Sequence, residues 1–174
     1  MLRKTDLVGS LQVHADNLRL ASVLRLLVRG TDLAATLQPI IEGAGSTAFQ
    51  PSKKLLENKP KLIHSADQLY LTLVSAAVTE ALELTRNYCS GTNQSEVLES
   101  QPWFHIFRIF RNALNHNFKI EFCKYDRTLL PLAWKNLSIE VGDDFRELTQ
   151  ELLPPNAAID WLADLESFIS SQLT

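Results

Sequence analysis

The chain has 174 residues, of which 45% are hydrophobic and 21% are charged, and its formal net charge is −3. This composition is close to that of an average globular domain, so it excludes a largely disordered chain and allows one domain with its own core. The acidic balance provides no overall attraction for nucleic acid, so any RNA contact must use a local basic patch.

The first third of the chain, residues 1–60, predicts two helices followed by a loop. Apolar residues recur at helical spacing over residues 6–29, and Gly30 can end this helix. A second, shorter helix is expected to run to about Glu42, with Thr31 or Asp32 as its cap. The glycines, hydroxyl residues and prolines that follow it are typical of a loop.

The core segment, residues 61–118, opens with the clearest helix, which is predicted over residues 65–90. Its apolar side is expected to include Leu69, Leu73, Ala76, Ala77, Glu80, Ala81 and Leu84. An unpaired carboxylate on an apolar face is costly, so Glu80 needs a partner, and Arg111 or Arg108 can provide it. The pair would either support the fold or position Arg111 in a site.

The second helix of this segment, which we call the motif helix, starts weakly near Ser95 and runs to about His116. Pro102 either kinks or restarts it. One side of this helix is apolar and carries Trp103, Ile106, Phe107, Ile109, Phe110, Ala113 and Leu114. The other side is polar and carries His105, Arg108, Arg111, Asn112, Asn115 and His116. This pattern is typical of an amphipathic helix with a solvated face, but it also allows a site.

Three details of the polar side favour a site. Lysine and glutamate, the usual residues of a solvated face, are absent between residues 100 and 118. Asparagine is a poor helix former, so Asn112 and Asn115 would cost stability without another role. Imidazole can move a proton near neutral pH, and guanidinium can hold a phosphate through two parallel hydrogen bonds. Because Asn117 falls on the apolar side, the helix is expected to end or bend near His116 and leave its imidazole accessible.

After the motif helix the composition changes. Residues 119–142 are rich in aromatic and β-branched residues, and TLLPLAW and LSIEV predict two short strands of a small β-hairpin or meander. Trp134 and Lys135 in this hairpin could stack on and steer a nucleic acid, although such a tryptophan more often covers the core. In residues 143–174 we expect a helix over about 143–152, a stop at two prolines and an amphipathic last helix.

Together these elements predict a single domain, residues 1–174, with a mainly α fold. It is an up-and-down bundle of four or more helices with a small β-hairpin after the motif helix.

Cys89 and Cys123 form no CxxC motif and no histidine array accompanies them, so we expect reduced thiols, no metal and no cofactor. No apolar run approaches roughly 18 to 20 residues, and the basic N-terminus lacks the apolar core of a signal peptide. We therefore expect a cytoplasmic protein without membrane contact.

The sequence Arg111-Asn112-Ala-Leu-Asn-His116 is an R-x4-H motif with a polar residue directly after the arginine. It resembles the signature of the HEPN superfamily (higher eukaryotes and prokaryotes nucleotide-binding domains). The apolar approach to the motif and its place in a core helix of an α bundle also fit this family. The motif covers about eleven residues, and the order of helices extends the resemblance to roughly residues 65–150.

The resemblance implies a metal-independent endoribonuclease that works as a homodimer, with the motifs of two protomers together in one cleft. His116 would take the proton from a ribose 2′-hydroxyl or protonate the leaving 5′-oxygen, and Arg111 would bind the scissile phosphate. Asn112 would orient His116 or the phosphate, and the product would end in a 2′,3′-cyclic phosphate. The remaining candidates for binding the RNA substrate are Arg108, Asn115 and His105.

Many members of this superfamily are toxins that a partner antitoxin protein holds in check, and others have lost activity and act as binding or assembly modules. Three interpretations therefore stay open. The first is a HEPN-type ribonuclease of toxin–antitoxin or phage-defence type. The second is a catalytically inactive HEPN-like dimer that binds nucleotides or proteins. The third is an unrelated helical regulator or adaptor whose polar face arose by chance.

Overall fold

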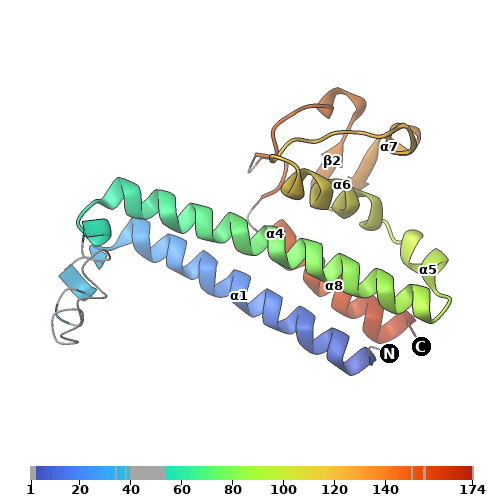
Figure 1. Ribbon diagram of the computed structural model, residues 1–174, viewed down its shortest axis with the longest axis horizontal. Helices are drawn as coiled ribbons and strands as arrows, with labels where there is room; N and C mark the ends of the chain where they lie inside the picture. Colours follow the sequence, from blue (N-terminus) through green and yellow to red (C-terminus); the bar gives the residue numbers. More distant parts are fainter. Residues whose placement is uncertain are drawn as a thin grey trace. The chain divides into compact units, whose positions relative to one another are not determined.

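A computed structural model describes residues 3–33, 35–37, 39, 54–149, 151–154 and 156–173 (Figure 1). The expected mainly α fold with a small hairpin after the motif helix is confirmed, and the motif helix is divided into α5 and α6 around Pro102. In chain order the elements are α1 (Lys4–Gly30), α4 (Lys59–Gly91), α5 (Ser95–Glu99), α6 (Phe104–Asn115), α7 (Lys124–Leu129), β1 (Leu132–Trp134), β2 (Leu137–Ile139), the 3-10 helix η2 (Val141–Asp143) and α8 (Ala157–Gln172).

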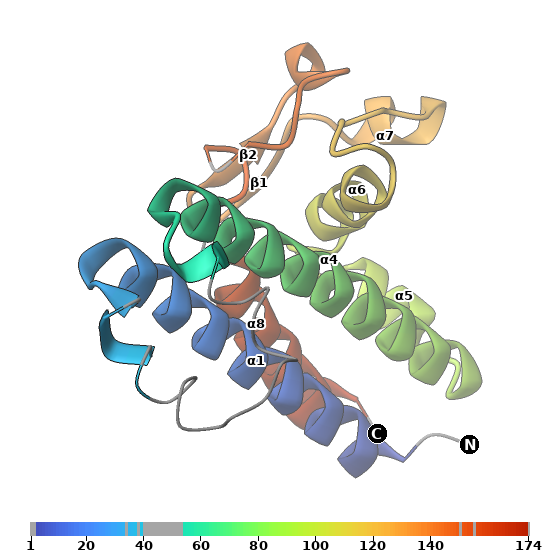
Figure 2. The same cartoon turned by 60° about the vertical axis from the view of Figure 1, so that its left-hand side comes forward.

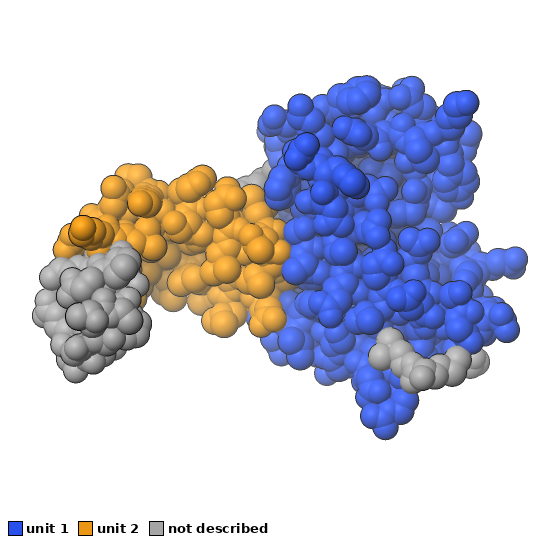
Figure 3. Space-filling model, in the orientation of Figure 1, with its two compact units in different colours: residues 1–16, 74–174 blue, residues 17–73 orange. Residues whose placement is uncertain are grey.

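The chain divides into two compact units (Figure 3). Unit 1 comprises residues 1–16 and 74–174, and unit 2 comprises residues 17–73. Unit 2 is built on the second half of α1 and the first part of α4. Unit 1 contains the start of α1, the rest of α4 and every later element, so all residues of the R-x4-H motif belong to it.

In unit 2, α1 and α4 run antiparallel and pack through an apolar seam (Figure 2). The seam is formed by the side chains that recur at helical spacing on one face of each helix, because only these are removed from water on packing. The buried members are Leu18, Ala21 and Val28 of α1 and Ala66 and Tyr70 of α4.

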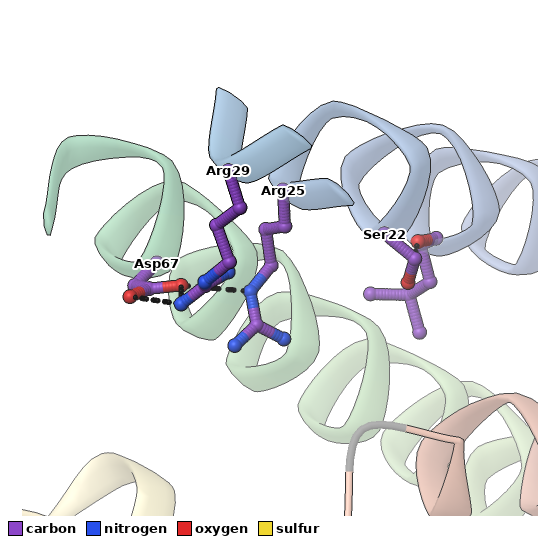
Figure 4. Close-up of polar contacts among 5 residues, drawn as sticks. Ser22, Arg25, Arg29 and Asp67 are labelled. Carbon is purple, nitrogen blue, oxygen red and sulfur yellow. Dashed lines mark hydrogen bonds and ion pairs between the residues drawn. The ribbon is translucent and has the colours of Figure 1, made fainter. Parts of the chain in front are cut away.

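A charged cluster lies on the same seam (Figure 4). Arg25 Nε donates to Asp67 Oδ1 at 2.8 Å, and Arg29 Nη2 donates to both carboxylate oxygens of Asp67 at 2.8 Å. Arg25 is only 8% exposed, and its guanidinium lies 4.5 Å from the centre of the Tyr70 ring. Asp67 is therefore the counter-ion of a nearly buried cation.

The core of unit 1 is an aromatic cluster that joins α6, α8 and the hairpin. Phe107 of α6 stacks on Trp161 of α8, with ring centres 4.4 Å apart. Trp103 meets Trp161 and Phe168 edge-on at 6.0 and 5.7 Å, and Trp134 of β1 meets Phe107 at 5.2 Å. The side of α6 that the sequence predicts to be apolar is thus the side that is buried.

The two strands form an antiparallel hairpin in which Leu132 lies opposite Ile139 and Trp134 lies opposite Leu137. Trp134, Leu137 and Ile139 are buried, as the alternation of side chains along a strand predicts. The indole N–H of Trp134 donates to Asp164 Oδ2 on α8 at 3.1 Å. Trp134 therefore covers the core and does not present a free surface for stacking on a nucleic acid.

The prediction of a helix over residues 143–152 is wrong. In the described residues of this range the backbone pairs instead with the chain that follows α6: the Phe145 N–H donates to Ile120 O at 2.8 Å, and the Leu148 N–H donates to Phe118 O at 2.7 Å. These long-range hydrogen bonds engage the backbone groups that a helix would use internally.

Candidate functional site

Helix α6 ends at Asn115, and His116 is the first residue beyond it. His116 has a φ of −124° and a ψ of 74°, outside the helical region, and Asn117 and Phe118 have positive φ values of 57° and 55°. The helix cannot continue through this backbone, so the end predicted near His116 is confirmed. The His116 side chain is exposed, and within the described residues it has no hydrogen-bond or ion-pair partner.

Two neighbours hold the side chain of Arg111. Its Nη2 forms an ion pair with Glu83 Oε1 on α4, and its Nη1 donates to Asn112 Oδ1 at 3.0 Å. The Arg111 and Glu83 side chains are 28% and 38% exposed, so the pair lies at an accessible edge of α4 and α6. The structure thus brings Arg111 and Asn112 together, but no hydrogen bond in the described part of the chain joins either of them to His116.

Asn115 fastens the end of α6 to α4. Its Nδ2 donates to Thr79 Oγ1 at 3.1 Å, and its Oδ1 lies 3.3 Å from Thr79 Oγ1 and 3.5 Å from Ser75 Oγ. Ser75, Thr79 and Glu83 are four residues apart, so they form one stripe of α4 facing the polar side of α6. The Asn115 amide therefore takes part in helix packing, and Arg111 makes the next contact along the same stripe.

The prediction that Glu80 pairs with Arg111 or Arg108 is wrong. Its Oε2 lies 3.3 Å from His14 Nε2, and its side chain is 57% exposed, so it does not lie on an apolar face. Glu83, one turn further along, pairs with Arg111 in its place. The buried face of α4 is rotated from the expected one and runs through Val74, Ala77, Val78, Ala81, Leu82 and Thr85.

His105 and Arg108 lie in a second cluster, with residues of α7. Arg108 forms an ion pair with Asp126, which is 2% exposed and also accepts the Cys123 N–H at 2.9 Å. The Tyr125 ring centre lies 5.5 Å from the Arg108 guanidinium and 6.0 Å from the His105 ring. Burial raises the pKa of Asp126, but hydrogen bonds from Cys123 and the pairing with Arg108 outweigh it and hold this pKa below its ordinary value. Arg108 therefore neutralises a buried carboxylate and fixes α7 on α6.

The imidazole of His105 is biased towards its neutral form. Burial lowers its pKa, and the nearby positive charge of Arg108 lowers it further. Its Nδ1 is buried and has no hydrogen-bond partner within the described residues. Two of the three predicted substrate-binding residues, His105 and Arg108, thus belong to the contact with α7. The third, Asn115, belongs to the contact with α4, as do Arg111 and Asn112.

A pocket of about 280 Å³ opens between α4, α5 and α6 beside the ion pair of Arg111 with Glu83. Its lining is mostly polar and consists of Glu83, Arg86, Asn87 and Ser90 of α4, Ser95, Leu98 and Glu99 of α5, and Phe104 of α6. The sequence interpretation missed this pocket. The available signal is the polar stripe at helical spacing, residues 83, 86, 87 and 90, directly before a turn.

Comparisons with protein-family models, with curated proteins and with solved structures find no match for this chain. Across the residues that the structure describes, no three histidine, cysteine or carboxylate side chains gather into a group that could hold a metal ion. None of the helices in that part of the chain has the length and apolar character needed to cross a membrane.

Proposed function

We propose that this chain is a metal-independent endoribonuclease of the HEPN type that acts in the cytoplasm as a homodimer. The observation that carries the proposal is the end of α6, where Arg111 and Asn112 share a hydrogen bond at an accessible edge and His116 is exposed just beyond the helix. We call these three residues the α6 site. They supply a guanidinium, an amide and an imidazole, which are groups suited to holding a phosphodiester and moving its protons.

In the proposed reaction, the ribose 2′-oxygen attacks the adjacent phosphorus, and the bond from phosphorus to the 5′-oxygen breaks. The His116 imidazole takes the proton of the 2′-hydroxyl or gives a proton to the leaving 5′-oxygen. Arg111 binds the non-bridging phosphate oxygens, on which negative charge grows in the transition state. The products are a 2′,3′-cyclic phosphate and a 5′-hydroxyl.

A second copy of the chain would complete the site. His116 lies five positions after Arg111, which corresponds to about 140° around an ideal helix, so one straight helix would not bring their side chains together. Two α6 sites facing each other would supply imidazole and guanidinium from both protomers. A cognate antitoxin protein that covers the α6 site would hold such an enzyme in check, as the resemblance to toxins implies.

The ion pair with Glu83 favours a second candidate function. A carboxylate that already neutralises Arg111 competes with phosphate for the same guanidinium. In this alternative the chain is a catalytically inactive HEPN-like dimer that binds nucleotides or a partner protein. RNA binding without cleavage distinguishes this alternative from the ribonuclease.

The test is incubation of the wild-type protein with total RNA and with tRNA in EDTA, followed by mapping of the product ends. We expect cleavage that leaves 2′,3′-cyclic phosphate ends, reduced by at least about 100-fold in His116→Ala and in Arg111→Ala. His64→Ala is the matched control, because His64 is an exposed histidine of unit 2. Expression of a toxin would also arrest growth, and either α6-site substitution would relieve the arrest.

Three outcomes would contradict the proposal. Cleavage that persists unchanged in His116→Ala would come from another nuclease. Sedimentation as a monomer at every concentration used would exclude the composite site. Absence of cleavage by a protein that sediments as a dimer would favour the binding module.

A further inference from the structure

The pocket between α4, α5 and α6 carries polar groups with few hydrogen bonds to the rest of the described chain. One of them, the Glu99 carboxylate, acts electrostatically on His105 and raises its pKa, against the larger lowering by burial. Within the part of the chain that the structure describes, the Arg86 side chain has only a long contact with Glu83, 3.9 Å between Nη1 and Oε1. Four further lining side chains have no hydrogen bond or ion pair within the described residues: Asn87, Ser90, Ser95 and Glu99. A concave site with several free donors and acceptors is suited to a small polar ligand.

The two charges that are not firmly paired define the chemistry of that ligand. Glu99 offers two acceptor oxygens, and Arg86 offers a planar fork of N–H donors. Among the nucleobases, guanine carries both complementary sets: N1–H and N2–H donors on one edge, and O6 and N7 acceptors on the next. Adenine has neither the N1–H nor the O6 acceptor, and the pyrimidines have no N7.

We propose that this pocket binds a guanine base. Glu99 accepts the hydrogen bonds of N1–H and N2–H, Arg86 donates to O6 and N7, and Leu98 and Phe104 contribute the apolar part of the lining. The volume of about 280 Å³ lies just below the range of roughly 300 to 1,000 Å³ for drug-sized ligands. A single base is therefore a better match than an extended ligand.

This inference rests on the proposed ribonuclease function, because it identifies the base that lies beside the scissile phosphate. Glu83 lines the pocket and also binds Arg111, so the base and the phosphate would occupy neighbouring positions. Cleavage would accordingly occur next to guanosine in single-stranded RNA.

The binding experiment uses guanosine and inosine, which lacks the 2-amino group, titrated into the full-length protein by calorimetry. We expect guanosine to bind the wild type, and inosine to bind at least about tenfold more weakly, because a hydrogen bond to a charged group is lost. Glu99→Gln should weaken guanosine binding at least about tenfold. Glu96→Gln is the matched control, because Glu96 is an exposed carboxylate of α5 outside the pocket, and it should bind as the wild type does.

The proposal is overturned if guanosine does not bind saturably, if inosine binds equally well, or if Glu99→Gln binds as tightly as Glu96→Gln. Circular dichroism melting of each variant establishes that it is folded. Cleavage mapping keeps the two proposals separate: cleavage without guanosine binding overturns the guanine pocket and leaves the ribonuclease. Guanosine binding without cleavage supports the pocket and overturns the ribonuclease.

Discussion

Asp67 is the counter-ion of a nearly buried arginine, so Asp67→Asn is expected to destabilise the protein more than the loss of a surface ion pair would. Arg25 is 8% exposed, and the substitution leaves its charge facing a neutral amide. Breaking a buried pair costs roughly 3 to 5 kcal/mol, whereas an exposed pair contributes about 1 kcal/mol or less. Because the Asp67 side chain is 25% exposed and the Tyr70 ring still contacts the guanidinium, we expect a loss of about 2 kcal/mol.

Two further variants test whether the buried charge is the cause. Arg29→Met removes the other partner of Asp67, whose side chain is 42% exposed, and should cost less than about 1 kcal/mol. Arg25→Met added to Asp67→Asn should restore more than half of the loss, because no charge then stays buried.

The assay is urea and thermal unfolding at pH 7 and at low pH. At roughly 2 to 4 °C per kcal/mol, Asp67→Asn should lower the melting temperature by about 4 to 8 °C. Burial raises the pKa of Asp67, but pairing with Arg29 and Arg25 outweighs it and lowers this pKa. The stabilisation is therefore present above about pH 4 and is lost as the pH falls through the folded pKa, so the variant and the wild type should converge in acid. Equal losses in Asp67→Asn and Arg29→Met, or no recovery on adding Arg25→Met, would refute the reasoning.

Three other substitutions probe unit 1. Phe107→Ala removes a fully buried ring that stacks on Trp161. It should lower the free energy of unfolding, measured by urea denaturation, by about 3 to 5 kcal/mol. A loss under about 1 kcal/mol would contradict this packing. Asp126→Asn leaves Arg108 without its anion and should cost about 3 kcal/mol at pH 7. Because the pKa of Asp126 is lowered, this difference should disappear as the pH falls below about 4, and a difference that persists in acid would exclude the ion pair as its source. Because the pKa of His105 is lowered in the folded protein, the unfolded chain binds a proton more readily. The free energy of unfolding should therefore fall as the pH drops below about 6.5. His105→Gln should make the free energy of unfolding depend less on pH in denaturation measured at several pH values.

Helical periodicity was sufficient to predict α1, α6 and α8, because each buries one side against a neighbour and its apolar residues recur at the spacing of that side. The end of α6 was predictable from one residue. Asn117 would have placed an amide among apolar side chains had the helix continued, and the chain leaves the helical region at His116.

The orientation of α4 was not predictable in the same way, because apolar residues occupy more than one of its sides. Leu69 is 44% exposed, whereas Thr85 is completely buried and donates its hydroxyl to Ala81 O in its own helix. Polarity alone therefore selects the wrong face. Because the buried face of α4 is rotated from the expected one, Glu83 pairs with Arg111 and Glu80 does not.

The region after α6 depends on contacts between segments that are distant in sequence. A helix was predicted over about residues 143–152, but the backbone from Phe145 to Leu148 pairs with Phe118 and Ile120. Helix propensity differs between residues by only a few tenths of a kcal/mol, so these long-range backbone hydrogen bonds outweigh it. Local sequence also gave no sign of α7, whose first turn is capped by Asp126 and held by Arg108.

The ion pair of Glu83 with Arg111 can either position or block the guanidinium, and a count of donors favours positioning. Each outer nitrogen of arginine carries two N–H groups. Glu83 engages one on Nη2 and Asn112 engages one on Nη1, so one donor remains on each nitrogen. A phosphate can accept hydrogen bonds from donors of this kind. A free arginine side chain loses about 2 kcal/mol of rotamer entropy when it is fixed. A guanidinium already held by Glu83 and Asn112 would therefore lose less side-chain entropy on binding phosphate. In the proposed ribonuclease, Glu83 therefore aligns Arg111, and its remaining carboxylate surface forms the wall that this site shares with the guanine pocket.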